Sequence, residues 1–597
     1  MGTKSRARRQ AFIAIGLLPI SAVLVVVCPV PGIVETNVIW AFASVYGAKT
    51  SRTMWKRLTR AAESDTDENS DTLHARFTPS PRLAILEKYL AARCHEYAAD
   101  FFPSPGDHPT ESEVLEAIGW SPISRDGDRL NSEDEQLEIL EVNNDLESVL
   151  RKASKEWANW YNEEPSVLIV GAGIFGTSTA YHLARKYGDP SRITVLDRTA
   201  SPPDPAASTD INKIIRADYS SRFYCDLAYE ALHAWATWPE LRAFYHRTGW
   251  IMLDEEGSDL SDRIREVFRD RGHDPTQDVP VSELETHWKG IMRGTQLKGF
   301  KDAYWNPEAG WCDAAAATAS LMEAAQKYGV KYVTDDIKEL CLEPGRVRCL
   351  RTASGHEYTA DQIVLATGAW TSSILSPAED ALEIEDRDRV ERQAQAAGVA
   401  VAHYKMSDAE MDRLSDMPVV VYGEHGELIP PPKNCLLKYT NSNTFTNTFR
   451  TSSGHEISMP PDRDQRIVSD RLKRETEATM AHKVMPTFTE GKQAEYWRLC
   501  WDARTPTQDW LLCRHPHPGL SNLYLAIGGS FHSYKFLPSA GKYMVNVLSE
   551  SGNGAEKDRA WGWKKGDAGW RGAHEKTTPK RELRDLEDKD SAYTAKL

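Results

Sequence analysis

The chain has 597 residues, which is long for a single domain and predicts two or three units. The composition, 41% hydrophobic and 27% charged, allows a sizeable core, and the net charge of −15 argues against a general affinity for nucleic acid. The nine cysteines include no Cys-x-x-Cys pair, so a reducing compartment fits better than a disulfide framework. The short run from Cys513 to His517 has no second ligand cluster, and we expect no metal site.

The N-terminal extension, residues 1–60, contains an apolar run over residues 11–28. This run is just long enough to span a bilayer, so a transmembrane segment over 11–30, and with it membrane contact, is one interpretation. A signal peptide is another, although no cleavage site of small residues follows. An unstructured extension without a membrane role is the third, and the sequence does not choose among them.

Residues 61–164 are acidic and irregular, with Pro-Ser-Pro clusters, and are predicted to be a linker with some local helix. The main globular body is expected over residues 165–551. Beyond it, residues 552–597 are charged and predict an extended or partly disordered C-terminal tail.

A glycine-rich turn follows the first strand of this body. Residues 167–170 form an unbroken apolar run, as in a buried parallel strand. Gly171 allows a tight turn, Gly173 allows the backbone to approach a pyrophosphate, and Gly176 allows the next helix to pack closely. The spacing therefore predicts a dinucleotide-binding turn.

The elements after the turn support this interpretation. A helix is predicted over residues 177–187, and a strand over 192–196 ends at Asp197. An acidic residue at that place can bond a ribose hydroxyl. A glycine-rich turn in another kind of α/β protein is the alternative.

Further elements alternate in an α/β manner along the body. A helix is predicted over residues 314–328 and strands over 330–333 and 523–527. The segment 357–368 is predicted to hold two strands and ends in Thr367 and Gly368. Between about 377 and 496 the pattern becomes rich in β-strand, as expected for an inserted substrate domain.

Several motifs in this body resemble those of one family. Residues 207–216 resemble the flavin-contacting segment of the sarcosine oxidase and fructosyl-amino-acid oxidase (amadoriase) family, and residues 305–313 resemble its segment before a central helix. Residues 500–506 match its Cys-x4-Thr-Pro motif, and residues 528–536 match its Gly-x6-Lys-Phe loop. The resemblance covers residues 165 to about 548 and is strongest to fungal saccharopine and pipecolate oxidases.

The resemblance implies an α/β fold with a discontinuous, Rossmann-type FAD domain and an antiparallel substrate domain. It implies that FAD is bound covalently through Cys500. The residues expected to contact the cofactor are Gly171, Gly173, Ile174, Phe175, Gly176, Asp197, Arg198, Ser208, Thr209, Lys213, Thr367, Gly368, Cys500 and Lys535.

Four cations are expected to act in catalysis. A carboxylate substrate needs a cation to hold it, and Arg216 and Lys535 are the candidates. Lys213 and Arg216 would share a face if their segment were helical, although a solvated helix face is the simpler explanation without the resemblance. The family places an oxygen-activating lysine in a strand comparable to that of Lys438, whose ammonium would stabilise the anion formed from O2. A solvent-facing lysine is the alternative.

The resemblance implies a monomeric amine oxidase for a small amino-acid substrate with a CH–NH group, with O2 reduced to H2O2. Saccharopine and pipecolate are the first expectations, with a fructosyl amino acid next. Sarcosine itself is disfavoured, because the family's bacterial sarcosine oxidases carry an aromatic residue where Asp502 stands. The alternatives are a nicotinamide-dependent dehydrogenase and a non-catalytic, membrane-tethered flavoprotein. The final residues, Ala595-Lys596-Leu597, resemble a peroxisomal signal, with membrane attachment as the alternative address.

Overall fold

The computed structural model describes residues 164–597 except 415–416, 424, 432–433, 566–578 and 588–597. Segment 1–60, nearly all of segment 61–164 and the terminal tripeptide therefore lie outside the described residues. The chain divides into two compact units, and the second, residues 165–185 and 190–597, carries the folded body. Of the first unit, only Glu164 and residues 186–189 are described; the Glu164 carboxylate accepts the N–H groups of Gly188 and Asp189 at 2.8 and 3.1 Å.

A six-stranded sheet begins at the glycine-rich turn. Its order is β21-β22-β13-β1-β2-β9, with every neighbouring pair parallel except β21 and β22. The strands are β1 (Val167–Val170), β2 (Ile193–Asp197), β9 (Lys331–Thr334), β13 (Gln362–Leu365), β21 (Leu511–Arg514) and β22 (Leu523–Ile527). The sheet is thus discontinuous in sequence, as expected, and β1 and β22 have the predicted bounds.

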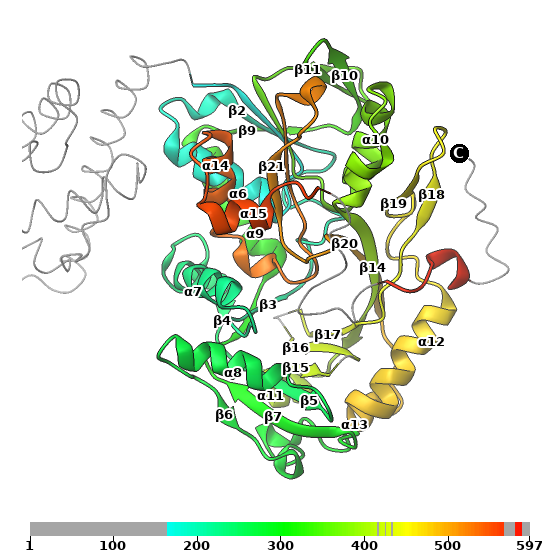
Figure 1. The fold of residues 1–597 in the computed structure, drawn as a ribbon. Coiled ribbons are helices and arrows are strands. Elements are labelled where there is room, and N and C mark those ends of the chain that lie inside the picture. The colour runs from blue at the N-terminus through cyan, green and yellow to red at the C-terminus, as the bar shows by residue number, and fades with distance from the viewer. Residues whose placement is uncertain (1–163, 415–416, 424, 432–433, 566–578, 588–597) are drawn as a thin grey trace, which may run out of the picture. The chain divides into compact units, whose positions relative to one another are not determined.

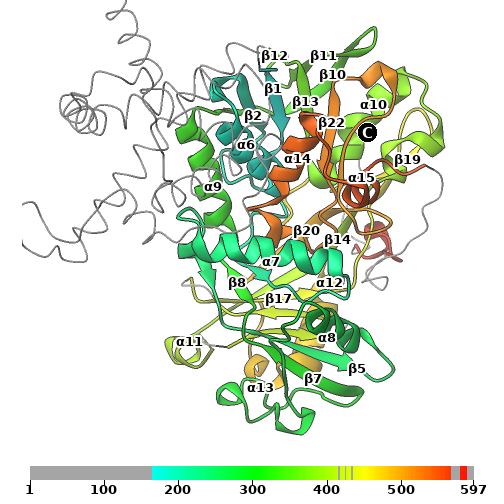
Figure 2. The same ribbon diagram turned by 60° about the vertical axis from the view of Figure 1, so that its left-hand side comes forward.

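Different layers cover the two faces of this sheet. One face packs on α10 (Thr371–Ala381) and on a three-stranded sheet of β10 (Ile337–Glu343), β11 (Arg346–Thr352) and β12 (Glu357–Tyr358). On the other side lie α6 (Ile174–Lys186) and α9 (Ala314–Tyr328) (Figures 1 and 2). A Cβ added to Gly541 in α14 (Ala540–Leu548) would lie 2.0 Å from the backbone of Ser178, so α14 packs tightly on α6.

A second sheet of eight strands forms the other part of the body, with the order β20-β14-β17-β16-β15-β5-β7-β6. The strands are β5 (Trp250–Glu255), β6 (Gln277–Asp278), β7 (Phe300–Asn306), β14 (Gln395–Lys405), β15 (Val419–Tyr422), β16 (Gly426–Ile429), β17 (Leu436–Asn441) and β20 (Tyr496–Arg504). Every pair is antiparallel except β15 and β5. Two features differ from expectation. The sheet is mixed, and the range 377–496 contains only part of it, because three strands come from residues 250–306.

Smaller elements connect and cover the sheets. They are β3 (Lys213–Ile215), β4 (Tyr245–His246), β8 (Gly310–Cys312), β18 (Thr448–Arg450), β19 (Glu456–Ser458), α7 (Arg222–Thr237), α8 (Leu260–Asp270), α11 (Asp408–Leu414), α12 (Asp470–Thr479) and α13 (Pro486–Thr489). No helix within the described ranges combines the length and the hydropathy that crossing a bilayer requires.

The start of the predicted tail is ordered, which corrects the expectation of an extended arm. Helix α15 (Ala555–Trp561) places Trp561 in the core with 1% exposure. Its ring stacks on Trp510, with a centroid distance of 4.8 Å. Further on, Thr446 pairs with the segment around Glu582, which accepts the Thr446 hydroxyl at 2.6 Å. An aromatic contact and a strand-like bridge thus attach a segment whose composition alone indicated disorder.

Candidate functional site

A cavity of about 2010 Å³ starts at the carboxyl end of the six-stranded sheet and reaches β16, β17 and β20 of the eight-stranded sheet. This volume exceeds the roughly 300–1,000 Å³ typical of a site for one small ligand. It brings together fourteen of the sixteen residues predicted from the sequence: Gly171, Gly173, Ile174, Phe175, Asp197, Arg198, Ser208, Lys213, Arg216, Thr367, Gly368, Lys438, Cys500 and Lys535. The other two, Gly176 and Thr209, lie beside it.

The glycine-rich turn is packed so closely at Gly171 and Gly176 that side chains would not fit there. Gly171 has φ +98°, and a Cβ there would lie 2.5 Å from the Ala366 carbonyl oxygen. A Cβ on Gly176 would lie 1.8 Å from the Gly171 oxygen, so Gly176 supports the turn from beneath. At Gly173 a Cβ would meet only the Ser208 hydroxyl, at 3.5 Å, beside the start of α6. The turn therefore presents bare backbone and a helix N-terminus to the cavity, as a pyrophosphate requires.

The polar groups around the turn also fit a dinucleotide. Asp197 ends β2, and its carboxylate accepts the N–H groups of Ala172 and Thr199 at 2.8 and 3.2 Å. Burial raises the pKa of this carboxyl group. The buried Ser208 Oγ has no hydrogen-bond partner within the described part of the chain, which leaves it available to a ligand. These features fit FAD. Thr209 does not line the cavity itself and donates its hydroxyl to the carbonyl of Pro203, which does.

Two further predicted residues have defined surroundings. The Arg198 guanidinium lies 4.0 Å from the centre of the Trp370 ring and donates to the Pro205 carbonyl at 3.0 Å. The Thr367 hydroxyl is 2.8 Å from that of Thr371. Stacking and hydrogen bonds thus fix both side chains at the edge of the cavity.

Lys438 points into the protein, on the cavity face of β17, with 1% exposure. Its Nζ lies 2.7 Å from Asp210 Oδ2 and donates to the Asn212 carbonyl at 3.1 Å. Burial lowers the pKa of this ammonium, and the Asp210 charge opposes that shift. The solvent-facing alternative is therefore wrong, and Lys438 is one half of a buried ion pair.

The same carboxylate also pairs with the second predicted lysine. Lys213 Nζ lies 3.4 Å from Asp210 Oδ2 and donates to Cys500 Sγ at 4.0 Å. His403 Nε2 is 3.7 Å from the other oxygen of Asp210. The Lys438 and Lys213 charges and the hydrogen bond to His403 hold the pKa of Asp210 well below its usual range despite burial. Asp210 is thus the centre of a cluster that sequence analysis did not identify.

Arg216 and Lys535 flank one aromatic ring. The Arg216 guanidinium lies 4.8 Å from the centre of the Tyr219 ring and 4.2 Å from that of Trp250. Lys535 Nζ donates to the Tyr219 hydroxyl at 3.0 Å and to the His532 carbonyl. Burial and the Arg216 charge hold the Lys535 pKa well below its usual range. Two close, buried cations form an environment that an anion would stabilise.

The segment that carries Lys213 and Arg216 is a strand rather than a helix. Residues 213–215 form β3, which pairs with β8. The expected helical face shared by Lys213 and Arg216 is therefore wrong. Both residues nevertheless line the cavity, because Arg216 follows the end of β3.

Two acidic residues of the cavity were not predicted as site residues, although Asp502 was noted as a difference from sarcosine oxidases. Asp502, on β20, accepts the N–H groups of Phe531 and Ala503 at 2.8 Å each, and burial raises its pKa to about 6. Glu427 lies on β16, on the face opposite the core residue Leu428, and its charge raises the pKa values of Lys213, Lys438 and Lys535. The predicted cations need acidic partners, and this need was the one signal that could have indicated such residues.

Comparisons with known proteins agree with this geometry. The model of the family described as FAD dependent oxidoreductase matches residues 166–547. The chain is 24% identical to L-saccharopine oxidase of Schizosaccharomyces pombe over 67% of this chain and 94% of that one. It is 25% identical to human peroxisomal sarcosine oxidase over 64% of this chain and 91% of the human one. The solved structure of fructosyl peptide oxidase from E. terrenum is similar, with a TM-score of 0.62 and 26% sequence identity. The match covers 71% of this chain and 97% of that one.

Proposed function

Because the chain belongs to the FAD-dependent oxidoreductase family, we propose that it is an amine oxidase for N-substituted or cyclic amino acids. The reaction converts a CH–NH group to C=N and reduces O2 to H2O2, after which water hydrolyses the imine. The carrying observation is that one cavity joins the glycine-rich turn, the cation pair Arg216–Lys535 and the Lys438–Asp210 ion pair. The nicotinamide-dependent alternative loses its support, because the matched family uses FAD.

The six-stranded sheet would hold FAD, and the eight-stranded sheet would contribute the substrate domain, within a body of residues 165–551. FAD supplies the hydride acceptor when it is bound. The turn at Gly171–Gly176 would hold its pyrophosphate, and Asp197 would bind a ribose hydroxyl. The Asp197 oxygens that already accept backbone N–H groups keep lone pairs for such a bond.

Arg216 and Lys535 would hold the substrate carboxylate. Binding an anion between them would offset their mutual repulsion and favour the protonated state of Lys535. Glu427 would attract the amine, which is cationic in water, to the same cavity. The site thus offers a cation pair and an anion to a zwitterionic substrate. These opposite charges would orient the substrate in the cavity.

Lys438 would provide the positive charge next to the site of oxygen reduction. A fixed ammonium stabilises the anion formed when O2 takes its first electron. Asp210 would keep that ammonium in place and protonated, although burial favours the neutral amine. Lys213, which contacts both Asp210 and Cys500, would lie against the cofactor instead.

A substrate panel tests the proposed function. Purified protein is mixed anaerobically with saccharopine, pipecolate, sarcosine or fructosyl-lysine, and the flavin absorbance is followed. We expect bleaching by at least one of the first two, with recovery of the colour and release of H2O2 when O2 is admitted. A yellow protein that no member of the panel bleaches would contradict the proposed substrate class, and a colourless one would contradict FAD binding.

We also propose a peroxisomal address from the terminal Ala595-Lys596-Leu597, because an H2O2-producing enzyme benefits from a compartment that contains catalase. The human relative carries a peroxisomal name, which agrees. An N-terminal fluorescent fusion should give puncta that overlap catalase and that disperse after deletion of residues 595–597. A signal that stays on membranes until residues 1–47 are removed would favour attachment through the apolar N-terminal run.

A further inference from the structure

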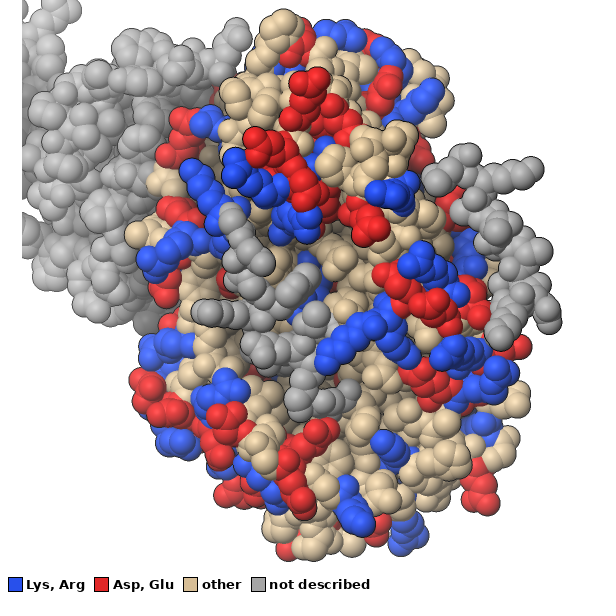
Figure 3. Space-filling view, turned by 45° about the vertical axis from the view of Figure 1, so that its right-hand side comes forward, with Lys and Arg blue, Asp and Glu red and all other residues tan. Residues whose placement is uncertain are grey.

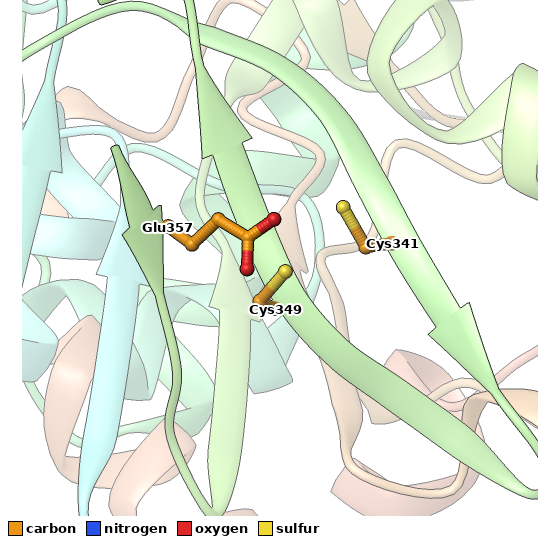
Figure 4. A group of neighbouring side chains, drawn as sticks. All are labelled: Cys341, Cys349 and Glu357. Carbon is orange, nitrogen blue, oxygen red and sulfur yellow. The ribbon is translucent and has the colours of Figure 1, made fainter. Parts of the chain in front are cut away.

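Two cysteines face each other on neighbouring strands of the three-stranded sheet and do not line the cavity described above. Cys341 on β10 is in direct register with Cys349 on β11. Their sulfur atoms and a carboxylate oxygen of Glu357, on β12, all lie within 4.8 Å of one another (Figure 4). Nothing in the proposed amine oxidation uses these three side chains.

The cysteine pair does not belong to the core cluster beneath the six-stranded sheet. The adjacent pair, Leu340 and Leu350, belongs to the core beneath the six-stranded sheet, so Cys341 and Cys349 lie on the opposite face. That face carries charged residues, with Arg351 paired to Glu339 and Glu357. A pair of thiols beneath an ion-pair network needs a reason other than packing.

The surroundings of Glu357 favour thiol chemistry over a metal. Its carboxylate accepts Arg348 NH1 at 3.1 Å and Arg351 NH2 at 2.9 Å, one on each oxygen. A metal ion would compete with two guanidinium groups for these oxygens. The two sulfur atoms, by contrast, lie within 4.8 Å of each other, as a pair of thiols that can react together requires.

The backbone suits a cross-strand disulfide. Residues directly opposite in an antiparallel pair have Cα atoms about 4.5–5.5 Å apart, within the range of about 4.4–6.8 Å that a disulfide spans. An irregularity of register lies directly beside the pair, where Arg348 is an extra residue in β11, and it gives β11 room to adjust. The two thiols also differ in access, because Cys341 is half-buried and Cys349 is buried.

We propose that Cys341 and Cys349 are a peroxide-sensitive dithiol that closes to a reversible disulfide. The Cys341 sulfur attacks H2O2: an S–O bond forms, the O–O bond breaks and one water leaves. The Cys349 sulfur then attacks the Cys341 sulfur: the S–S bond forms, the S–O bond breaks and a second water leaves with the Cys349 proton. In total two thiols and one H2O2 give one disulfide and two waters. The proposal rests on the proposed oxidase only for the source of the peroxide.

The position of the pair gives the disulfide a consequence for the site. Strand β10 begins at Ile337, which lines the cavity together with Lys338. A covalent bond at Cys341, in the same strand, would fix β10 against β11 close to the cavity wall. The H2O2 produced by the oxidase would thus form a covalent bond in a strand that also contributes to the cavity wall.

The test uses the full chain and added H2O2, without amine. Remaining thiols are alkylated, and peptides are analysed by mass spectrometry with and without dithiothreitol. We expect the peptides of Cys341 and Cys349 to be joined and to separate on reduction. Cys341→Ser and Cys349→Ser should each abolish the joined species, whereas Cys513→Ser, a half-buried cysteine elsewhere, should not change it. Failure of added peroxide to join the wild-type peptides overturns the proposal.

Two further arms separate the possible failures. Joining during amine turnover that catalase prevents supports both the dithiol and the oxidase. Joining by added peroxide but not during turnover supports the dithiol and contradicts the proposed source. Stoichiometric binding of Zn²⁺ alone, with protection of both thiols and no joining by peroxide, would assign the cluster to a metal and overturn the dithiol.

Discussion

Asp210 shows how one buried carboxylate can organise a site. It lies within 3.4 Å of two lysine Nζ atoms and 3.7 Å from the His403 ring. Two ammonium groups this close would repel each other without a negative charge between them. Asp210 therefore determines where the ammonium groups of Lys213 and Lys438 lie.

Replacement Asp210→Asn should slow the oxidation of reduced enzyme by O2 more than its reduction by substrate. The Lys438 pKa, already lowered by burial, falls further without the carboxylate, so the neutral amine gains population. Reoxidation should then recover as the pH is lowered, because Lys438 regains its proton. Stopped-flow measurement of both half-reactions between pH 6 and 9 checks this.

Lys438→Met is the matched control for this prediction. It should slow reoxidation about 100-fold, the usual loss when one electrostatic donor is removed, at every pH. Equal losses in both half-reactions of Asp210→Asn, with no pH dependence, would mean that Asp210 supports the fold and not the charge of Lys438.

Cys500 is buried on β20 and lines the cavity beside Lys213. We propose that it bears the flavin as a thioether. Acid-precipitated wild-type protein should then stay yellow, whereas Cys500→Ala should release its colour to the supernatant. Colour that washes out of the precipitated wild type would contradict attachment at Cys500.

Asp502 makes stability depend on pH in a predictable direction. Burial raises its pKa from 3.8 to about 6, so the folded state favours the protonated carboxyl group. Its contribution is fully present below about pH 4 and is lost as the pH rises through about 6, a change of about 3 kcal/mol. The melting temperature of Asp502→Asn, relative to wild type, should therefore increase between pH 4 and 7.5. A difference that does not change with pH would contradict the raised pKa.

At the scale of elements, the C-terminal helix α15 places one large aromatic side chain in the core. Trp561 stacks on Trp510 and contacts Tyr543 and Phe223 edge-on, at 5.0 and 5.4 Å between ring centres. Aromatic pairs of this kind add to the free energy gained from burial. Helix α15 therefore depends on tertiary contacts more than on its own short length.

Trp561→Ala should lower the free energy of unfolding by about 3–5 kcal/mol, because it leaves a large cavity among aromatic rings. Glu556→Ala, at an exposed position of the same helix, is the control and should have little effect. Thermal melts of both variants provide the measurement. Equal melting temperatures of Trp561→Ala and wild type would show that α15 adds nothing to the folded body.

At the scale of the molecule, the described surface offers no large apolar patch. Ile467, at 53% exposure, is the one large hydrophobic side chain of the described residues that is strongly exposed. Acidic and basic side chains alternate over the face shown in Figure 3. Stable homodimers usually bury extensive apolar area, and we propose from the described part of the surface that the chain is a monomer.

Light scattering after size exclusion should give a single species near the chain mass of 67.0 kDa. A species of twice this mass at micromolar concentration would contradict the monomer. Repeating the measurement without residues 1–60 would show whether the apolar N-terminal run causes any association.

The sequence alone determined the local parts of the cofactor site. Strands β1 and β22, helix α9 and the turn at Gly171 were all predicted, because periodicity and glycine spacing are properties of short segments. Cys500 and Lys535 were found because their motifs resemble those of a family. That resemblance also placed Lys438 in the cavity, which its own strand pattern left open.

Only the tertiary structure decided which charges meet. Asp210 lies in the segment before β3, Lys438 on β17 and His403 on β14. No local pattern pairs Asp210 with residues that lie more than 190 positions away. The same holds for the eight-stranded sheet, in which strands from residues 250–306 join strands near 420. Long-range pairing depends on how separate segments bury their surfaces together. The sequence of one segment does not show which other segment it will pack against.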